Sequence, residues 1–252
     1  WLKHIQEKQF FDDAIIQIYF TVYQMLTYSE DSSYFEQLKD LVKELGEYVN
    51  NFDLNEIYFL AINYCARKLR LGQFQYAQEA LNLYKVGIEQ KILFEGKYLS
   101  PWTFTNVVKL SLKEGLYEWG EQFINQYEKS LPPKFRENCM HYNLSELYYS
   151  TKQYGLAQQY LLQVVHSDLH YYLGARLLLA KIYYETQEDE ALRSLLASFT
   201  IFLKRNKQIS KSIKEHYLNF CALLLKIVRS GQKRKAIIEK QIREAKLVAD
   251  RG

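Results

Sequence analysis

The stretch LRLGQFQYAQEALNLY, residues 69–84, contains a pattern that returns further along the chain. A glycine is followed two residues later by an aromatic residue and five residues later by a small one, and apolar residues then continue at helical spacing. Nearly the same order of residue types occurs in KEGLYEWGEQFINQY (113–127) and in STKQYGLAQQYLLQV (150–164). This recurrence predicts a protein built by repeating one small helix–turn–helix unit.

The small residue after each turn measures the length of the unit. These residues are Ala77, Gly120, Ala157, Ala191 and Ala236, with separations of 43, 37, 34 and 45 residues. The shortest separation equals one helix–turn–helix repeat, and the longer ones require extra residues near 87–99 and 203–214. Five repeats of unequal length are therefore expected.

The predicted turns contain residues that stop a helix and reverse the chain. Gly72, Gly115 and Gly231 stand where the first helix of a repeat must end, and glycine accepts the left-handed conformation that such a turn often needs. The small residue that follows lets the two helices of a hairpin approach closely. Pro132 and Pro133 end the second helix of one repeat, because proline cannot continue a helix.

The composition favours an all-α protein. The chain has only 3 Pro and 10 Gly in 252 residues, and it is rich in Leu, Ala, Glu, Gln and Lys. It also has 22 Tyr, a residue suited to helix–helix contacts that are partly exposed to water. We interpret most of these tyrosines as packing residues rather than as site residues.

Roughly residues 58–250 resemble the tetratricopeptide repeat family as five units, and the resemblance is good in the first three. The residues that carry the resemblance are Gly115, Tyr117, Gly120, Pro132, Tyr148, Tyr154 and Ala157. The resemblance implies a right-handed α-α superhelix of antiparallel helical hairpins. The expected array spans residues 57–252, with repeats at about 58–100, 101–137, 138–172, 173–212 and 213–250.

Other parts of the chain depart from this consensus. The fourth repeat has Arg176 where the family usually has a large apolar residue, and its turn, TQEDEA, is expected to be one residue short. The fifth repeat lacks the aromatic residue after its glycine. Residues 1–56 do not match, and we predict that they form an N-terminal hairpin of helices at about 4–28 and 33–50, either a cap or a divergent repeat.

The resemblance also implies that the first helices of the repeats line a concave groove that binds a peptide or a partner protein. Helical geometry indicates which residues of 101–113 face away from the packed side: Trp102, Thr105, Asn106, Lys109, Leu112 and Lys113. Nine residues before the turn residues Gly72, Gly115 and Lys152 stand three asparagines, Asn63, Asn106 and Asn143. An asparagine amide can both donate to and accept from an extended peptide backbone.

The resulting candidate binding residues are Asn63, Arg70, Trp102, Asn106, Lys109, Lys113, Tyr142 and Asn143. Arg70 and Lys109 could attract an acidic ligand, and the two aromatic residues could stack on it or pack against it. The alternative is that the asparagines hydrogen-bond between helices. Glu146 and Ile62 stand where the pattern that recognises a C-terminal carboxylate requires Asn or Lys, so that recognition is not supported.

A basic segment at the end of the chain favours a second interpretation. Residues 226–252 contain nine Lys or Arg against three acids, while the whole chain has a net charge of +4. The candidate basic patch consists of Lys233, Arg234, Lys235, Lys240 and Arg243. It could bind nucleic acid or another acidic surface, or it could be the solvated face of a terminal helix. Against nucleic acid, the expected concave face has few stacking aromatics beside its basic residues, and no base-reading pair of residues recurs across the repeats.

No pattern in the sequence indicates an enzyme. The stretch HSDLH, which spans 166–170, places two His four residues apart, but a metal site needs further ligands, so neither a metal site, a catalytic residue, a cofactor nor a small-molecule substrate is predicted. No phosphate-binding glycine loop or HExxH motif occurs. The expected partner is therefore a protein or an extended peptide, and stacking of array ends makes self-association a further expectation.

The cysteines and the hydropathy pattern suggest where the protein works. Cys65, Cys139 and Cys221 are odd in number and far apart, which favours a reducing compartment such as the cytoplasm. No run of about 20 apolar residues predicts a transmembrane helix. Because the sequence opens with Trp1 rather than Met, we expect it to be a fragment of a longer chain.

Overall fold

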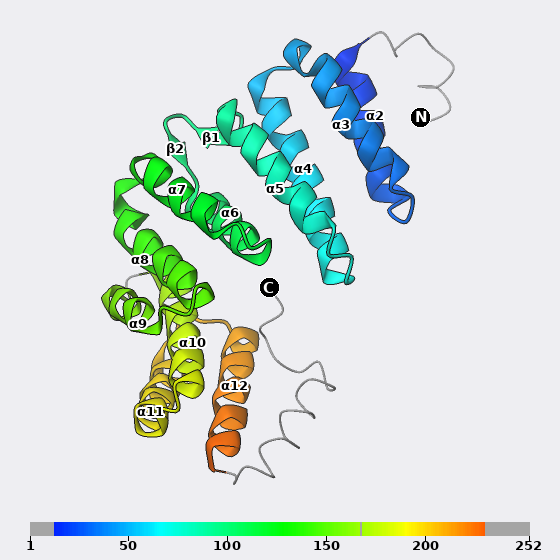
Figure 1. Cartoon of the computed structure of the whole chain (residues 1–252). Coiled ribbons are helices and arrows are strands. Elements are labelled where there is room, and N and C mark those ends of the chain that lie inside the picture. The colour runs from blue at the N-terminus through cyan, green and yellow to red at the C-terminus, as the bar shows by residue number, and fades with distance from the viewer. Residues whose placement is uncertain (1–12, 167, 230–252) are drawn as a thin grey trace. The chain divides into compact units, whose positions relative to one another are not determined.

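The computed structural model describes residues 13–166 and 168–229, and these are almost entirely helical (Figure 1). The described residues form eleven α-helices, joined by short turns, with one small β-hairpin between α5 and α6. Helices that follow one another along the chain pack in pairs. The all-α fold predicted from the sequence is confirmed.

The chain divides into two compact bodies, residues 1–136 and 137–252, which we call the N-terminal and C-terminal bodies. The N-terminal body contains α2 (Ala14–Thr27), α3 (Ser33–Leu45), η2 (Gly46–Tyr48), α4 (Asn51–Arg70), α5 (Tyr76–Glu89), β1 (Phe94–Glu95), β2 (Tyr98–Leu99), α6 (Pro101–Lys113), α7 (Tyr117–Tyr127) and η3 (Glu128–Ser130). Within it, α3 packs on α2, α5 on α4 and α7 on α6. Each pair is a helical hairpin with a first and a second helix.

The C-terminal body contains most of α8 (Pro133–Ser150), then α9 (Tyr154–Gln163), α10 (Leu169–Glu185), α11 (Asp189–Arg205) and α12 (Lys211–Arg229). Here α10 packs against both α9 and α11, and α12 packs on α11. None of the helices in the described part of the chain combines the length and the hydropathy needed to cross a membrane.

Four of the hairpins turn in the same way. At the end of the first helix, one residue adopts a left-handed conformation, with φ between +61° and +87°: Gly72, Gly115, Lys152 and Gln187. The next residue then donates its backbone N–H to the carbonyl five residues earlier, for example Leu116 to Ser111 at 2.8 Å and Gln153 to Tyr148 at 2.7 Å. This bond satisfies a helix-end carbonyl and reverses the chain. The recurrence seen in the sequence thus corresponds to one repeated turn geometry.

The register of the fourth hairpin differs from the prediction. Five residues after the left-handed residue stand Ala77, Gly120, Ala157 and Leu192, all of them buried. The turn at Gln187 is therefore not one residue short, and the predicted equivalent, Ala191, is only half-buried. The prediction was wrong because it took a small residue as the marker, whereas this hairpin buries a leucine at that point.

Gly120 shows why a small residue is used in the hairpin of α6 and α7. A Cβ built on it would lie 2.7 Å from Oγ of Ser111, so a larger side chain would displace that hydroxyl, which donates to the carbonyl of Val108. Close by, the rings of Phe104 and Phe123 lie 5.1 Å apart across the same pair of helices. The expected close approach is confirmed here.

Side-chain caps fix where several helices begin. The side chains of Asp13, Asn50, Ser100 and Asp168 each accept a hydrogen bond from a backbone N–H two or three residues later. Such caps satisfy N–H groups that have no partner within the helix. Helix α2 therefore begins at Ala14, and α4 begins at Asn51, inside the segment that we had taken as a separate N-terminal hairpin.

The extra residues expected near 87–99 form the β-hairpin and the loop before it. Phe94 pairs with Leu99 and Glu95 with Tyr98. Leu93 packs so closely on Gly87 that a Cβ there would lie 2.8 Å from it. This insertion is tied back to α4 by a hydrogen bond from Asn55 Nδ2 to the carbonyl of Ile92, at 2.8 Å.

Candidate functional site

The exposed face of α6 carries four of the predicted binding residues. Trp102, Asn106, Lys109 and Lys113 are all exposed, and we call them the α6 stripe. The indole of Trp102 is prominent, because 61% of this residue is accessible to solvent. Thr105, which we had placed on the same face, is buried, since α6 packs against α5 as well as α7 and keeps only a narrow face open.

Two neighbours of the α6 stripe show how it is held. Lys113 Nζ lies 5.1 Å from the ring centre of Phe74, an exposed residue of the turn between α4 and α5. Asn106 Nδ2 donates a hydrogen bond to the hydroxyl of Tyr84 on α5, at 3.1 Å. The Asn106 amide therefore makes a hydrogen bond between two helices of the fold. This agrees in part with the alternative interpretation, in which the asparagines hydrogen-bond between helices.

The predicted residues of α4 are also exposed. Asn63 and Arg70 lie seven residues apart, or about two helical turns, so they share a face of α4. The last turn of this helix is basic, because it contains Arg67 and Lys68 as well as Arg70. Cations are favourable at a helix C-terminus, where the helix dipole is negative.

The two predicted residues of α8 are not available to a ligand. Tyr142 is 5% exposed and Asn143 is fully buried. The Tyr142 ring packs on Tyr171 of α10, and Gly174 leaves room for it, since a Cβ there would lie 2.9 Å from the ring. Asn143 Nδ2 donates to the Cys139 carbonyl within α8, at 2.8 Å. The third asparagine of the predicted series is therefore a core residue, and including it was wrong.

The remaining candidates have simpler positions. The basic patch, Lys233, Arg234, Lys235, Lys240 and Arg243, lies outside the described residues. In the HSDLH stretch, Asp168 caps α10 by accepting from the backbone N–H of His170. Burial raises the pKa of the Cys65 thiol to about 12, so this buried cysteine stays neutral and does not act as a nucleophile at ordinary pH.

The structure contains a groove that the sequence did not indicate, which we call the α3–α5 groove. It has a volume of about 560 Å³. Its walls come from the second helices α3 and α5, and its floor comes from the first helix α4. Its lining residues include Leu38, Lys39, Val42, Lys43, Gly46, Glu47, Val49, Asn51, Leu54, Ile57, Tyr58, Ala61, Glu79, Asn82, Leu83, Val86, Gln90 and Ile92.

The floor of the groove is apolar and its rim is mixed. Leu54, Ile57 and Tyr58 of α4 are each less than 10% exposed, so they belong to the core and show only one edge to the groove. Val86 on the α5 wall is 40% exposed. Primary amides of Asn51, Asn82 and Gln90 also line the groove. This combination of apolar surface with a few polar groups is typical of binding sites.

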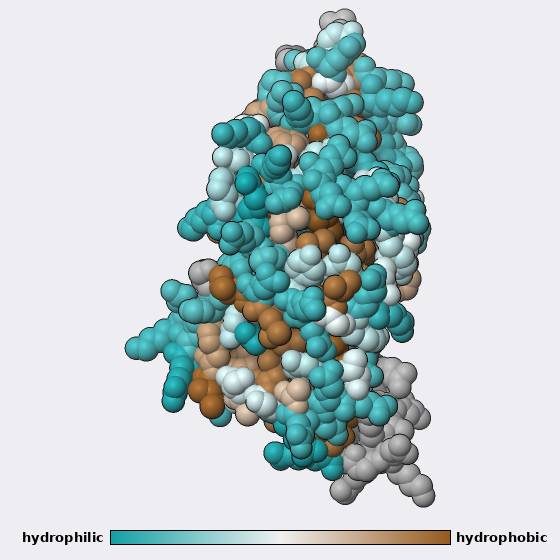
Figure 2. Space-filling view, turned by 60° about the vertical axis from the view of Figure 1, so that its left-hand side comes forward, coloured by the Kyte–Doolittle hydropathy of each residue, from teal (hydrophilic) through white to brown (hydrophobic). Residues whose placement is uncertain are grey.

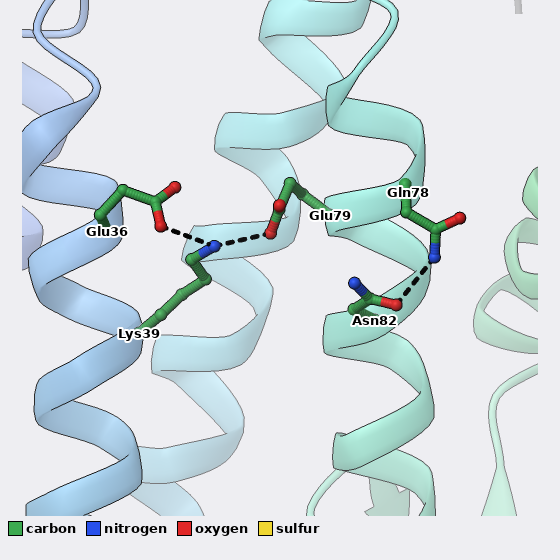
Figure 3. Close-up of polar contacts among 5 residues, drawn as sticks. All are labelled: Glu36, Lys39, Gln78, Glu79 and Asn82. Atoms are coloured by element: carbon green, nitrogen blue, oxygen red, sulfur yellow. Dashed lines mark hydrogen bonds and ion pairs between the residues drawn. The ribbon is translucent and has the colours of Figure 1, made fainter.

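A charged bridge joins the two walls (Figure 3). Lys39 Nζ of α3 lies 2.8 Å from Glu79 Oε2 of α5 and 2.9 Å from Glu36 Oε2 of its own helix. Burial alone would lower the pKa of Lys39, but the hydrogen bonds to Glu79 and Glu36 outweigh it and raise that pKa. On the same wall, Gln78 Nε2 donates to Asn82 Oδ1 at 2.8 Å. Lys39 therefore stays charged, and two carboxylates surround it.

Charge is divided between the first and second helices of the N-terminal body. The second helices α3, α5 and α7 contain seven Asp or Glu and three Lys, whereas the first helices α2, α4 and α6 contain two acids and five Lys or Arg. On the face seen in Figure 2, most of the molecular surface is hydrophilic, and apolar residues gather in a few patches. The α6 stripe and the α3–α5 groove thus differ in charge as well as in position.

Comparisons with protein families, curated proteins and solved structures found no match for this chain. The candidate surfaces therefore rest on the geometry described above. Sequence reasoning found the α6 stripe because helical spacing alone defines that face. It missed the groove, whose only signal was the apolar character of Val42, Leu83 and Val86 on second helices.

Proposed function

We propose that this protein is a non-catalytic interaction scaffold, a tetratricopeptide-like array of helical hairpins that binds an extended segment of a partner protein. The repeated left-handed turn at Gly72, Gly115, Lys152 and Gln187 supports the array. In such an array the first helices line one side, which would place the exposed residues of α4 and α6 on a common binding surface.

The observation that carries the proposal is the α6 stripe. A 61%-exposed tryptophan stands on one helix face with Asn106, Lys109 and Lys113. An exposed Trp offers a large contact area, and residues of this type dominate binding energy at interfaces. The excess of cations on the first helices favours an acidic segment, which Arg70 on α4 would also attract.

The absence of a catalytic role is part of the proposal. The buried, neutral thiol of Cys65 and the capping role of Asp168 support it, because neither group is poised for chemistry. No metal or other cofactor is proposed. Cys65, Cys139 and Cys221 are buried and form no disulfide with one another, which is compatible with work in the cytoplasm.

The test compares partner capture by the wild-type chain, by a triple-substituted variant of the α6 stripe and by a double-substituted control. Immobilised wild-type protein and the stripe variant Trp102→Ala/Lys109→Glu/Lys113→Glu are incubated with native lysate, and bound proteins are quantified by mass spectrometry at low and moderate salt. We expect the stripe variant to lose the acidic partners of the wild type. Capture by the wild type should also weaken with salt, because exposed charges are screened.

The matched control is Lys204→Glu/Arg205→Glu, which reverses two exposed cations on α11 in the C-terminal body. This control should keep the wild-type partners. If the stripe variant and the wild type capture the same proteins, the α6 stripe is not the binding surface. If the α11 variant loses them equally, the attraction is a general effect of net charge.

A further inference from the structure

We propose that the α3–α5 groove is a second docking site, which takes a short segment of a partner protein with apolar anchor residues flanked by Lys or Arg. This site is independent of the α6 stripe, since it is built by α3, α4 and α5 and shares no residue with it. Three features of the groove support this occupant: its apolar floor, the excess of acidic residues on the helices that form its walls, and the rigidity of those walls.

The apolar floor accounts for the anchor residues. Leu38, Leu54 and Ile57 close the floor from the core and are at most 7% exposed, so the accessible apolar surface lies mainly on the walls, where Val86 is 40% exposed. Apolar side chains that enter would remove this surface from water, which favours binding. The groove has a volume of about 560 Å³. A three-turn helix, taken as a cylinder 10 Å wide and 15 Å long, occupies on the order of 1,200 Å³, about twice as much. The groove therefore has room for side chains but not for a whole helix.

The rim accounts for the flanking cations. Glu47 and Glu79 line the groove, and Glu36 joins them at the bridge, whereas Lys39 and Lys43 are the lysines that line it. Lys39 already contacts two carboxylates, so its positive charge is more than balanced. The wall helices α3 and α5 together contain five Asp or Glu and three Lys. A segment with Lys or Arg beside its apolar anchors would be complementary to this rim, and an acidic segment would be repelled.

The walls are held in place before any ligand binds. The Lys39–Glu79 pair joins α3 to α5 near one end, and beyond it the rings of Phe35 on α3 and Tyr76 on α5 lie 5.8 Å apart. Near the other end, the bond from Asn55 to Ile92 fixes the loop that follows α5. A preformed groove loses little conformational entropy on binding, which favours docking of a short segment.

The test selects ligands from a random dodecapeptide phage library with the full chain as bait. Two variants fill the groove with bulk: Val86→Trp and Asn82→Trp, each at a residue with solvent access. Ile201→Trp on α11, which is 50% exposed in the wild type, is the matched control. Circular dichroism and thermal unfolding confirm that each variant is folded before it is used.

We expect selected peptides with at least two apolar residues and a positive charge. Their affinity, measured as synthetic peptides by fluorescence anisotropy, should fall at least tenfold in Val86→Trp and Asn82→Trp. It should be unchanged in Ile201→Trp and in Trp102→Ala, so failure of this site and failure of the α6 stripe are distinguishable. Glu47→Lys should weaken binding three- to tenfold, whereas Glu114→Lys, in the turn after α6, should not.

Three results would overturn the proposal. Selected peptides that bind both filled variants like the wild type would place their site elsewhere. Acidic selected peptides would contradict the charge argument. A dimer of the wild-type chain in sedimentation analysis, lost in Val86→Trp, would show that a second copy of the chain occupies the groove instead.

Discussion

Two spaces between successive second helices of the N-terminal body are bridged in different ways. Between α3 and α5, the bridge is the ion pair of Lys39 and Glu79, and a groove remains beside it. Between α5 and α7, Lys85 Nζ lies 4.3 Å from the ring centre of Trp119, which stacks on Phe123. An ion pair spans a gap through two thin side chains, whereas a row of aromatic rings occupies its volume.

The aromatic row continues along α7. The rings of Phe123 and Tyr127 lie 4.9 Å apart, so Trp119, Phe123 and Tyr127 form a series at helical spacing. In α5, the residue at the same distance from the turn as Phe123 is Ala80. One hairpin thus uses bulk where its neighbour uses a methyl group. The other two positions of the row are aromatic in both helices, with Tyr76 and Tyr84 in α5, so the comparison teaches that α5 and α7 differ at the centre of the row.

The largest expected effect comes from removing the centre of the aromatic row. Phe123→Ala should destabilise the protein by about 3–5 kcal/mol, because it leaves a cavity where a buried ring contacted Phe104, Trp119 and Tyr127. Urea unfolding measures the change. Phe52→Ala, at a residue that is 75% exposed, is the control and should change stability by less than about 0.5 kcal/mol. Equal losses would mean that the row does not support α7.

The ion pair should contribute less than the aromatic row. Lys39 and Glu79 are partly exposed, with 28% and 31% of their side chains accessible, so the pair is screened by water. A double-mutant cycle with Lys39→Met and Glu79→Gln should give a coupling energy of about 0.5–1 kcal/mol that falls as salt is added. A coupling energy of zero would show that the groove walls are held by packing alone.

A third bridge, in the C-terminal body, should respond to acid. The Glu185 carboxylate of α10 accepts hydrogen bonds from the hydroxyls of Tyr149 and Tyr154. Burial alone would raise its pKa, but these two bonds outweigh it and lower that pKa. Because its pKa is lowered, the ionised Glu185 carboxylate stabilises the folded protein when the pH is above the ordinary glutamate pKa of about 4.3. This stabilisation is lost as the pH falls through the lower pKa of the folded protein.

Wild type and Glu185→Gln should therefore differ most at neutral pH and converge as the pH falls below about 4. The difference should stay below about 1 kcal/mol, because the residue is largely exposed. Thermal unfolding between pH 3 and 7 measures it. The Lys39 bridge depends on pH in the opposite direction. Because the pKa of Lys39 is raised, its contribution to folding stability is lost only when the pH rises above about 10. A difference that grows in acid would contradict the assignment.

The smallest expected effect is at Lys85, the cation between α5 and α7. Lys85→Met should cost about 0.5 kcal/mol, the usual strength of an exposed cation–π contact, while it keeps the apolar stem on Trp119. Chemical unfolding in replicate measures this change against Lys97→Met, whose cation lies 5.2 Å from the ring of Tyr98 on the β-hairpin. If the Lys85→Met variant is the more stable of the two, the Lys85 cation does not stabilise the fold, and the aromatic row alone connects α5 and α7.

Local features of the sequence determined the helical hairpins. Apolar spacing depends on residues a few positions apart, and Gly72 and Gly115 turn the chain because glycine adopts positive φ without a steric penalty. The exposed face of α6 followed from the same spacing. These predictions succeeded, except at Thr105, because their physical causes lie within one or two helical turns.

Only the tertiary structure decided which residues face a ligand. Asn143 follows the same sequence pattern as Asn63 and Asn106, yet it is buried in the core of its body. Its neighbour Tyr142 fits against Gly174 of α10. The α3–α5 groove likewise joins residues about 40 positions apart, such as Lys39 and Glu79. Burial and cavities depend on the volumes of side chains brought together by packing, and a periodic pattern within one helix does not contain that information.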